Sequence, residues 1–145
     1  MAQSASKVQF SLIYTNDVLG EVEPCGWFRS PLGGVAKKST LISQMKKEGK
    51  KVLLLDTGNL LFRKPLQTET KRRDALLRVD LLMQSYNEMG YDACNVGEKD
   101  LMMGLKFLSD VSQKAKFPFV SANLVDKKTG KVIFKPYVIE EIGGL

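Results

Sequence analysis

The sequence of 145 residues contains no histidine and only two cysteines, Cys25 and Cys94. Zinc sites in proteins need about four ligands, so this chain lacks the imidazole and thiolate donors for a tightly held zinc or iron ion. Cys25 lies in the turn sequence Glu-Pro-Cys-Gly and is expected to be exposed, whereas Cys94 is expected to be buried and inert. The sequence leaves open whether the two cysteines form a disulfide.

The sequence also lacks any apolar run of the roughly 18–20 residues needed to cross a bilayer, and residues 1–7 contain no apolar signal core. This start is compatible with a mature N-terminus behind an added methionine and equally with a native cytosolic start. The net charge is +6, but no interleaved aromatic or glycine-rich motif accompanies it, so a solvated basic surface is favoured over nucleic-acid binding. The least expected basic cluster is Lys71-Arg72-Arg73, because the start of a helix favours acidic side chains.

What the chain does have is an alternation of apolar strand patterns with amphipathic helix patterns. The predicted strands cover residues 8–15, 52–55, 92–96 and 117–122, and a last extended segment covers 131–142. The predicted helices are one from residue 35 that Gly49 ends, a long one that follows the loop over residues 57–68 and stops at Gly90, and a third over residues 101–111. This order is typical of parallel strands joined by right-handed crossovers. The sequence therefore predicts an α/β fold, a mostly parallel sheet with crossover helices, in one domain over residues 1–145.

Polar residues collect where the predicted strands end. They are Asn16, Asp17, Asp56, Asn59, Glu98, Asp100 and Asn123. Because sites in parallel α/β sheets form at the carboxyl ends of the strands, these residues predict an ancestral pocket at that edge. Asp56, which precedes Thr57-Gly58, is expected to bond the amides of its own loop.

Six segments, taken in their order along the chain, resemble the N-terminal metallophosphoesterase region of the 5'-nucleotidase family, within the calcineurin-like superfamily. They are Tyr14 to Gly20, Glu23 to Gly26, Leu32 to Ala36, Leu54 to Asn59, Gly90 to Asp100 and Phe117 to Asn123. The resemblance implies a site in which two metal ions bind a phosphate and activate a water. It also implies a partial domain, which supplies the first sheet of a two-sheet sandwich and ends before the family's remaining histidines.

The chain departs from the family pattern at four positions of these loops. Leu19 stands in place of a histidine ligand, and Asn59 stands in place of the aspartate that bridges both metals. Glu98 replaces a ligand asparagine, and Lys99 replaces the catalytic histidine with a cation that two dications would repel. Asp17 keeps the family residue. The resemblance therefore implies a degenerate metal site at Asp17, Asn59 and Glu98, with no catalytic residue at position 99.

Three functions are compatible with these residues. The leading hypothesis is a domain that has lost catalysis, holds no metal and is kept for binding a ligand or a partner. The second is a hydrolase of phosphate esters or nucleotides in which the oxygen atoms of Asp17, Asn59, Glu98 and Asn123 hold one Mg²⁺ or Mn²⁺, because such hard ions prefer oxygen ligands. The third is a nucleotide-binding module in which Lys99 and Asn123 contact the ligand.

The segment from Val52 to Leu55 is apolar at every position, so both faces of this strand need cover. Helices can cover one face. If the second face were left bare, its exposed apolar area would be larger than the few hundred Å² that monomers usually tolerate. The simplest cover is a second copy of the chain, and the alternative is the tail from Lys131 folding back over the sheet. The resemblance implies the periplasm or the cell exterior, with the cytoplasm as the alternative.

Overall fold

The computed structural model describes residues 8–26 and 32–142. Within these residues, four strands form one parallel sheet in the spatial order β1-β2-β3-β4, the same as their order along the chain. The strands are β1 (Ser11–Thr15), β2 (Val52–Asp56), β3 (Ala93–Asn95) and β4 (Phe119–Val120). The helices are α1 (Val35–Lys47), α2 (Glu69–Met89), the short 3-10 helix η1 (Glu98–Leu101) and α3 (Gly104–Ser112). The predicted α/β class, with a parallel sheet and crossover helices, is confirmed.

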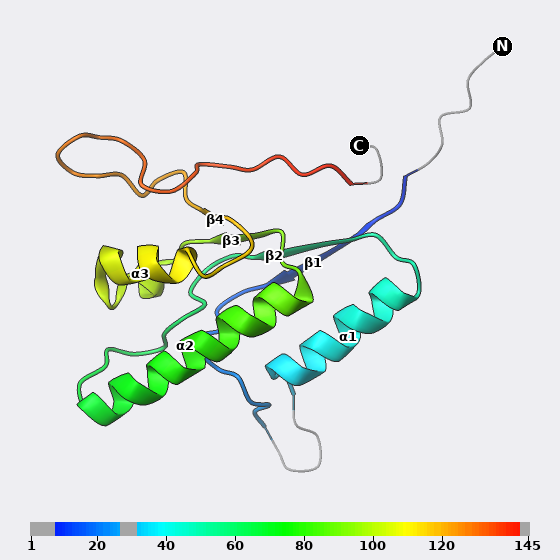
Figure 1. The fold of residues 1–145 in the computed structure, drawn as a ribbon, viewed down its shortest axis with the longest axis horizontal. Helices are drawn as coiled ribbons and strands as arrows, with labels where there is room; N and C mark the ends of the chain where they lie inside the picture. Colours follow the sequence, from blue (N-terminus) through cyan, green and yellow to red (C-terminus); the bar gives the residue numbers. More distant parts are fainter. Residues whose placement is uncertain (1–7, 27–31, 143–145) are drawn as a thin grey trace.

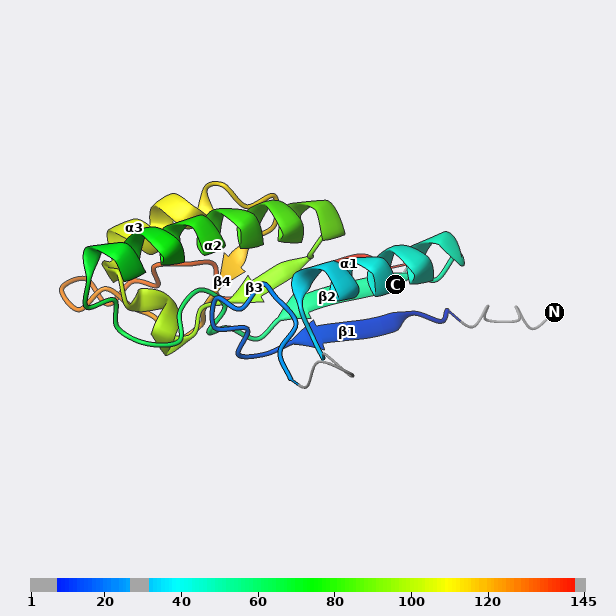
Figure 2. The ribbon, with the colours of Figure 1, turned by 90° about the horizontal axis from the view of Figure 1, so that it is seen from below.

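The strand order explains where the helices lie. When each new strand is added on the same side of the last, right-handed crossovers place the connecting helices on the same face of the sheet. Figures 1 and 2 show this arrangement, with α1, α2 and α3 together on one side of the strands. The described part of the chain is therefore one helical layer on one sheet.

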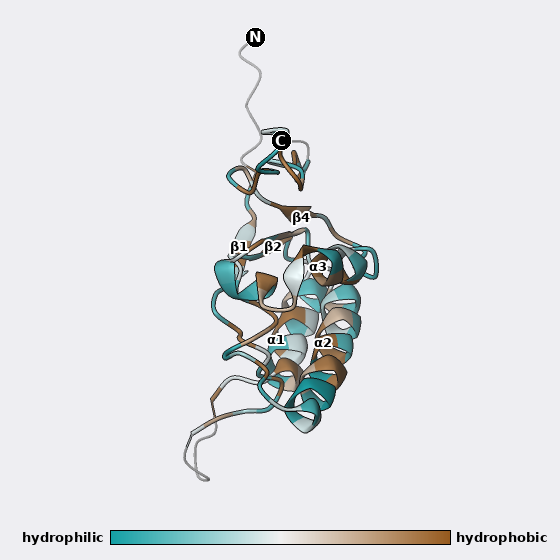
Figure 3. Cartoon of the chain, turned by 90° about the vertical axis from the view of Figure 1, so that its left-hand side faces the viewer, coloured by the Kyte–Doolittle hydropathy of each residue, from teal (hydrophilic) through white to brown (hydrophobic). Residues whose placement is uncertain are grey.

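The ends of α2 follow from local sequence. Thr68 Oγ1 accepts a hydrogen bond from the Lys71 N–H at 3.3 Å, and Gly90 ends the helix at φ 70°, a conformation that glycine adopts without a steric penalty. The helix alternates between hydrophilic and hydrophobic positions along its length (Figure 3). None of the helices in the described residues is long and apolar enough to cross a membrane.

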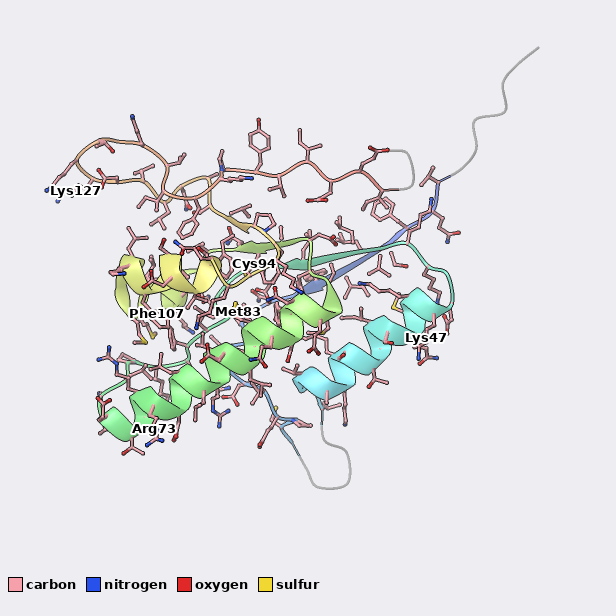
Figure 4. The ribbon with its side chains drawn as sticks, in the orientation of Figure 1. Lys47, Arg73, Met83, Cys94, Phe107 and Lys127 are labelled. Atoms are coloured by element: carbon pink, nitrogen blue, oxygen red, sulfur yellow. The ribbon has the colours of Figure 1, made fainter. Side chains whose placement is uncertain are left out.

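The core lies between the sheet and the helices. Leu54 of β2, Cys94 of β3 and Leu82 of α2 are fully buried in it, and Tyr86 stacks on Tyr91 with ring centroids 3.9 Å apart. Figure 4 shows Met83 and Cys94 between α2 and the strands. Both cysteines are free, Cys25 exposed and Cys94 buried, so the described structure contains no disulfide between them.

Two predicted elements differ from the structure. The helix expected over 101–111 is divided into η1 and α3, because Gly104 takes a φ of 84° that an α-helix cannot continue through. The strand expected over 117–122 is only the short β4, since Ser121 turns away to bond its own loop through Oγ. Apolar spacing alone could not locate either break.

The face of the sheet opposite the helices is open at β1. Leu12 and Tyr14 point to that side and are 54% and 66% exposed, whereas Ile13 packs against the core. The extended tail pairs with the other edge of the sheet, where the Ser121 N–H donates to the Lys135 carbonyl at 2.9 Å. The tail therefore lies beside β4 and leaves the apolar side chains of β1 uncovered.

Candidate functional site

The loops that follow β1 and β2 run side by side at the carboxyl ends of the strands. Asp17 N–H donates to the Gly58 carbonyl at 3.2 Å, Leu19 N–H to the Asn59 carbonyl at 2.9 Å, and Gly20 N–H to the Leu60 carbonyl at 2.8 Å. This backbone pairing extends the contact between the two chain segments beyond the ends of the strands. It brings Asp17 and Asn59 together although they are far apart in sequence.

Asn59 is the centre of the candidate site. Its Nδ2 donates to Asp17 Oδ1 at 2.8 Å, and its Oδ1 accepts the Lys99 backbone N–H at 2.9 Å. Asn16 Nδ2 donates to the other oxygen of Asp17 at 3.3 Å. The side-chain amide of Asn59 thus both donates and accepts a hydrogen bond with neighbouring loops, and it links three loops of the chain.

Backbone conformation at this site is unusual. Within the described residues, the non-glycine residues with positive φ are Asp17 at 50°, Leu19 at 57° and Asn59 at 56°. Asparagine and aspartate tolerate this left-handed region, but leucine adopts it at a cost of order 1–3 kcal/mol. Such strain persists only where surrounding contacts impose it, and here the paired loops supply those contacts.

A fully buried carboxylate, that of Asp100, holds the site loops in place. Its oxygens accept the backbone N–H groups of Asn59, Leu61 and Gly97, each at 2.9 Å. Burial raises the pKa of the Asp100 carboxyl above its usual value, and the three N–H donors act in the opposite direction. A side chain at Gly97 would lie only 2.4 Å from Asn59, so glycine is required for this close approach.

The other predicted site residues lie outside this hydrogen-bonded cluster. Glu98 is exposed, and its side chain makes no hydrogen bond or ion pair with the part of the chain that the structure describes. Asn123 is also exposed, and its Oδ1 accepts a hydrogen bond from Ser121 Oγ at 3.0 Å. The structure therefore joins Asp17, Asn59 and the backbone of Lys99, while Glu98 and Asn123 take no part in their contacts.

A second polar cluster, which the sequence did not predict, lies in the core behind these loops. Asp56 Oδ2 accepts hydrogen bonds from Thr15 Oγ1 at 2.5 Å and Tyr86 OH at 2.8 Å, and its Oδ1 accepts the Gly58 N–H as expected from the sequence. Lys38 Nζ donates to Tyr86 OH at 2.9 Å and lies 4.2 Å from the centre of the Tyr86 ring. The cluster ties α1 and α2 to the ends of β1 and β2.

Burial dominates the ionisation of this second cluster. It lowers the pKa of Lys38 from 10.5 to about 8, against a smaller opposing attraction from Asp56. Burial also raises the pKa of Tyr91 to about 12 and raises that of Tyr86 strongly. The sequence did carry a signal for Lys38, which lies on the apolar stripe of its helix between Val35 and Ile42.

The residues present do not fit the two-metal site that the family resemblance implies. Asp17 supplies one exposed carboxylate, and the side-chain oxygen of Asn59 already accepts the Lys99 N–H. In residues 8–26 and 32–142, no group of three or more histidine, cysteine, aspartate or glutamate side chains is placed to hold a metal ion. An amide that is used on both sides also supplies no negative charge to balance two dications.

Known proteins resemble the chain in sequence. No family profile matches it. It is 30% identical over 152 aligned residues to a 2',3'-cyclic-nucleotide 2'-phosphodiesterase/3'-nucleotidase from Haemophilus influenzae, and 34% identical over 137 residues to Protein UshA from Salmonella pullorum. These alignments cover 97% and 90% of this chain, but only 22% and 23% of the relatives. The chain thus spans less than a quarter of the length of these proteins.

Solved structures resemble the fold. A 5'-nucleotidase precursor from Thermus thermophilus superposes with a TM-score of 0.73 at 30% identity, over 93% of this chain and 26% of that protein. The calcineurin-like phosphoesterase YfkN from Bacillus subtilis superposes with a TM-score of 0.68 at 25% identity, over 91% of this chain and 42% of the other. The sequence and the fold agree: the homologues of this chain are members of the 5'-nucleotidase family, and the chain has the fold of their N-terminal calcineurin-like metallophosphoesterase region.

Proposed function

We propose that this domain has lost the catalysis of its family and is kept for binding a ligand or a partner. The observation that carries the proposal is the double engagement of Asn59, which donates to Asp17 and accepts from the Lys99 backbone. These hydrogen bonds give the loops a stable arrangement that depends on no metal ion. Lys99, at the position of the family's catalytic histidine, further disfavours dications near this loop.

The alternative is a phosphate-ester hydrolase with a single Mg²⁺ or Mn²⁺. It draws support from Asp17, whose carboxylate is exposed at the carboxyl ends of the strands and adjoins a second oxygen-bearing side chain. Against it, the chain has no histidine to move protons, and Glu98 does not contact the Asp17–Asn59 pair. We therefore rank a metal-free binding domain above it.

The ligand we propose is a nucleotide or another phosphate compound, recognised near Lys99 and Asn123. Support comes from the relatives, which are named as nucleotidases and cyclic-nucleotide phosphodiesterases, and from the positive charge of Lys99 at the site loops. From the resemblance to bacterial 5'-nucleotidases and UshA proteins we also propose the periplasm or the cell exterior as the location, with the cytoplasm as the alternative. Nucleic acid is not a proposed partner.

Hydrolysis measured with added Mn²⁺ tests this function. The full chain is assayed on bis(p-nitrophenyl) phosphate and on a nucleoside monophosphate, beside the variant Asp17→Ala and with elemental analysis of the purified protein. We expect equal background rates for both proteins and no stoichiometric transition metal. Mn²⁺-stimulated turnover that disappears in Asp17→Ala would falsify the loss of catalysis.

We further propose that a second copy of the chain covers the open sheet face. The support is the exposure of Leu12 and Tyr14 on a face that neither the helices nor the tail cover. Light scattering at micromolar concentration should give the mass of two chains, and Leu12→Lys should give the mass of one. A single-chain mass for the unmodified protein, with no apolar surface detectable by a dye, rejects this association.

A further inference from the structure

A pocket of about 480 Å³ lies between the loop after β2 and the first turns of α2. Its floor is apolar and is formed by the buried side chains of Leu61 and Phe62 together with Leu66 and Ala75. The volume is within the range of about 300–1,000 Å³ typical of small-molecule sites. The pocket is thus large enough for an organic ligand and has an apolar base on which such a ligand can rest.

The rim of the pocket is strongly basic. Arg63, Lys64, Lys71 and Arg78 line it, and Asp74 is the single acidic side chain among the lining residues. Arg63 forms an exposed ion pair with Glu21 at 3.3 Å, but the other three cations have no ion-pair partner within the described residues. Their positive charge is therefore available to a ligand. Lys71 also belongs to the basic cluster whose place at the start of a helix the sequence leaves unexplained.

The pocket is separate from the loops around Asn59. Two residues connect the pocket to these loops: Leu61 lines the pocket while its backbone N–H donates to Asp100, and Arg63 of the rim pairs with Glu21 of the loop after β1. The basic residues of the rim come from the loop after Leu61 and from one face of α2, where positions 71, 74, 75 and 78 follow helical spacing. A ligand there would not depend on the residues of the candidate phosphoesterase site.

We propose that this pocket binds a small organic anion, with its apolar body on the floor and its anionic group at the basic rim. Charge complementarity selects this class. A neutral apolar molecule would leave the cations of the rim unused, and an inorganic anion would leave the apolar floor in water. This inference does not rest on the proposed function of the Asn59 loops, and either one can fail without the other.

The proposal is tested with a pair of dyes that share one aromatic skeleton and differ by a single sulfonate group. Binding of 8-anilinonaphthalene-1-sulfonate to the full chain is measured by fluorescence and compared with its neutral counterpart, N-phenyl-1-naphthylamine. We expect the anionic dye to bind about tenfold more tightly, a ratio that corresponds to one or two favourable charge contacts. The double variant Lys71→Gln/Arg78→Gln should remove most of this preference while leaving the neutral dye nearly unaffected.

Three further variants locate the binding. Ala75→Trp places a large ring over the floor and should weaken both dyes about tenfold or more, and circular dichroism checks that it folds. Lys47→Gln controls for the loss of a positive charge elsewhere and should leave the binding of both dyes unchanged, because Lys47 lies at the end of α1, far from Arg73 and the first turns of α2 in Figure 4. Unchanged binding in Ala75→Trp and in the double variant, or loss of binding in Tyr14→Ser on the open sheet face, overturns the proposal.

Discussion

Replacing Asn59 by aspartate should turn a metal-independent contact into a cation-dependent one. In the present chain, Asn59 Nδ2 donates to Asp17 Oδ1 at 2.8 Å. An aspartate at this position has no proton to donate at pH 7, so it would set two carboxylates against each other. The Lys99 N–H would still find an acceptor, because the side-chain oxygen that it now contacts has a counterpart in aspartate.

The expected loss of stability combines two effects. Two like charges about 4 Å apart repel by about 1 kcal/mol in water and about 4 kcal/mol at an effective dielectric constant of 20. Because Asp17 is exposed and Asn59 is half-buried, we take a value near the lower end. The lost hydrogen bond to a charged group adds about 1 kcal/mol after solvent screening. We therefore expect Asn59→Asp to lower the free energy of unfolding by about 2–3 kcal/mol.

Urea unfolding at pH 7, with and without Mn²⁺, measures both parts of the prediction. A divalent cation between the two carboxylates should restore about 2–3 kcal/mol when its concentration reaches about a hundred times its dissociation constant. Lowering the pH to 4 should also restore stability, because protonation of one carboxylate removes the repulsion. The unmodified chain should respond to Mn²⁺ by less than about 0.5 kcal/mol.

Gln84→Glu is the control for the change in net charge, since Gln84 is exposed on α2 and away from the site loops. It should change the unfolding free energy by less than about 0.5 kcal/mol and should not respond to Mn²⁺. Two outcomes contradict this prediction: an Asn59→Asp variant as stable as the unmodified chain, or an unmodified chain that Mn²⁺ stabilises as much as the variant.

Three other perturbations probe the supporting contacts. Because the pKa of Lys38 is lowered to about 8 in the fold, the unfolded chain binds more protons above that pH, so stability should rise by about 2–3 kcal/mol between pH 8 and 10. Lys38→Met should lack this rise in urea unfolding curves measured across that range; an identical rise would assign the titration to other groups. Asp100→Asn places an amide donor against one or more backbone N–H groups and should lower the free energy of unfolding in urea by about 2–4 kcal/mol. A decrease below about 0.5 kcal/mol would show that the three hydrogen bonds are dispensable. Gly97→Ala places a Cβ atom within 2.4 Å of Asn59 and should lower the free energy of unfolding by about 1–3 kcal/mol. It should also accelerate hydrogen exchange of the backbone amides in the site loops, and unchanged exchange would count against the close approach.

Much of the architecture could be predicted from the pattern of apolar residues. The run Val52 to Leu55 and the stripe of α2 were recognisable because burial on a strand or helix imposes a fixed period on the sequence. The break at Gly104 was not recognisable, since a glycine within an apolar helical stripe is compatible with either a continuous or a divided helix. The predicted site residues came from strand ends and family resemblance, which locate loops without giving side-chain contacts.

The sequence by itself was enough for the resemblance to the 5'-nucleotidase family, the parallel α/β fold and the lack of histidine among these 145 residues. Only the tertiary structure decided that Asn59 uses both ends of its amide, that Asp100 rather than Glu98 holds the loops, and that Lys38 is buried against Tyr86. The physical reason is the range of the interactions concerned. Period and turn chemistry depend on near neighbours in the chain, whereas these hydrogen bonds join residues about 40 or more positions apart, whose meeting depends on the register of the whole sheet.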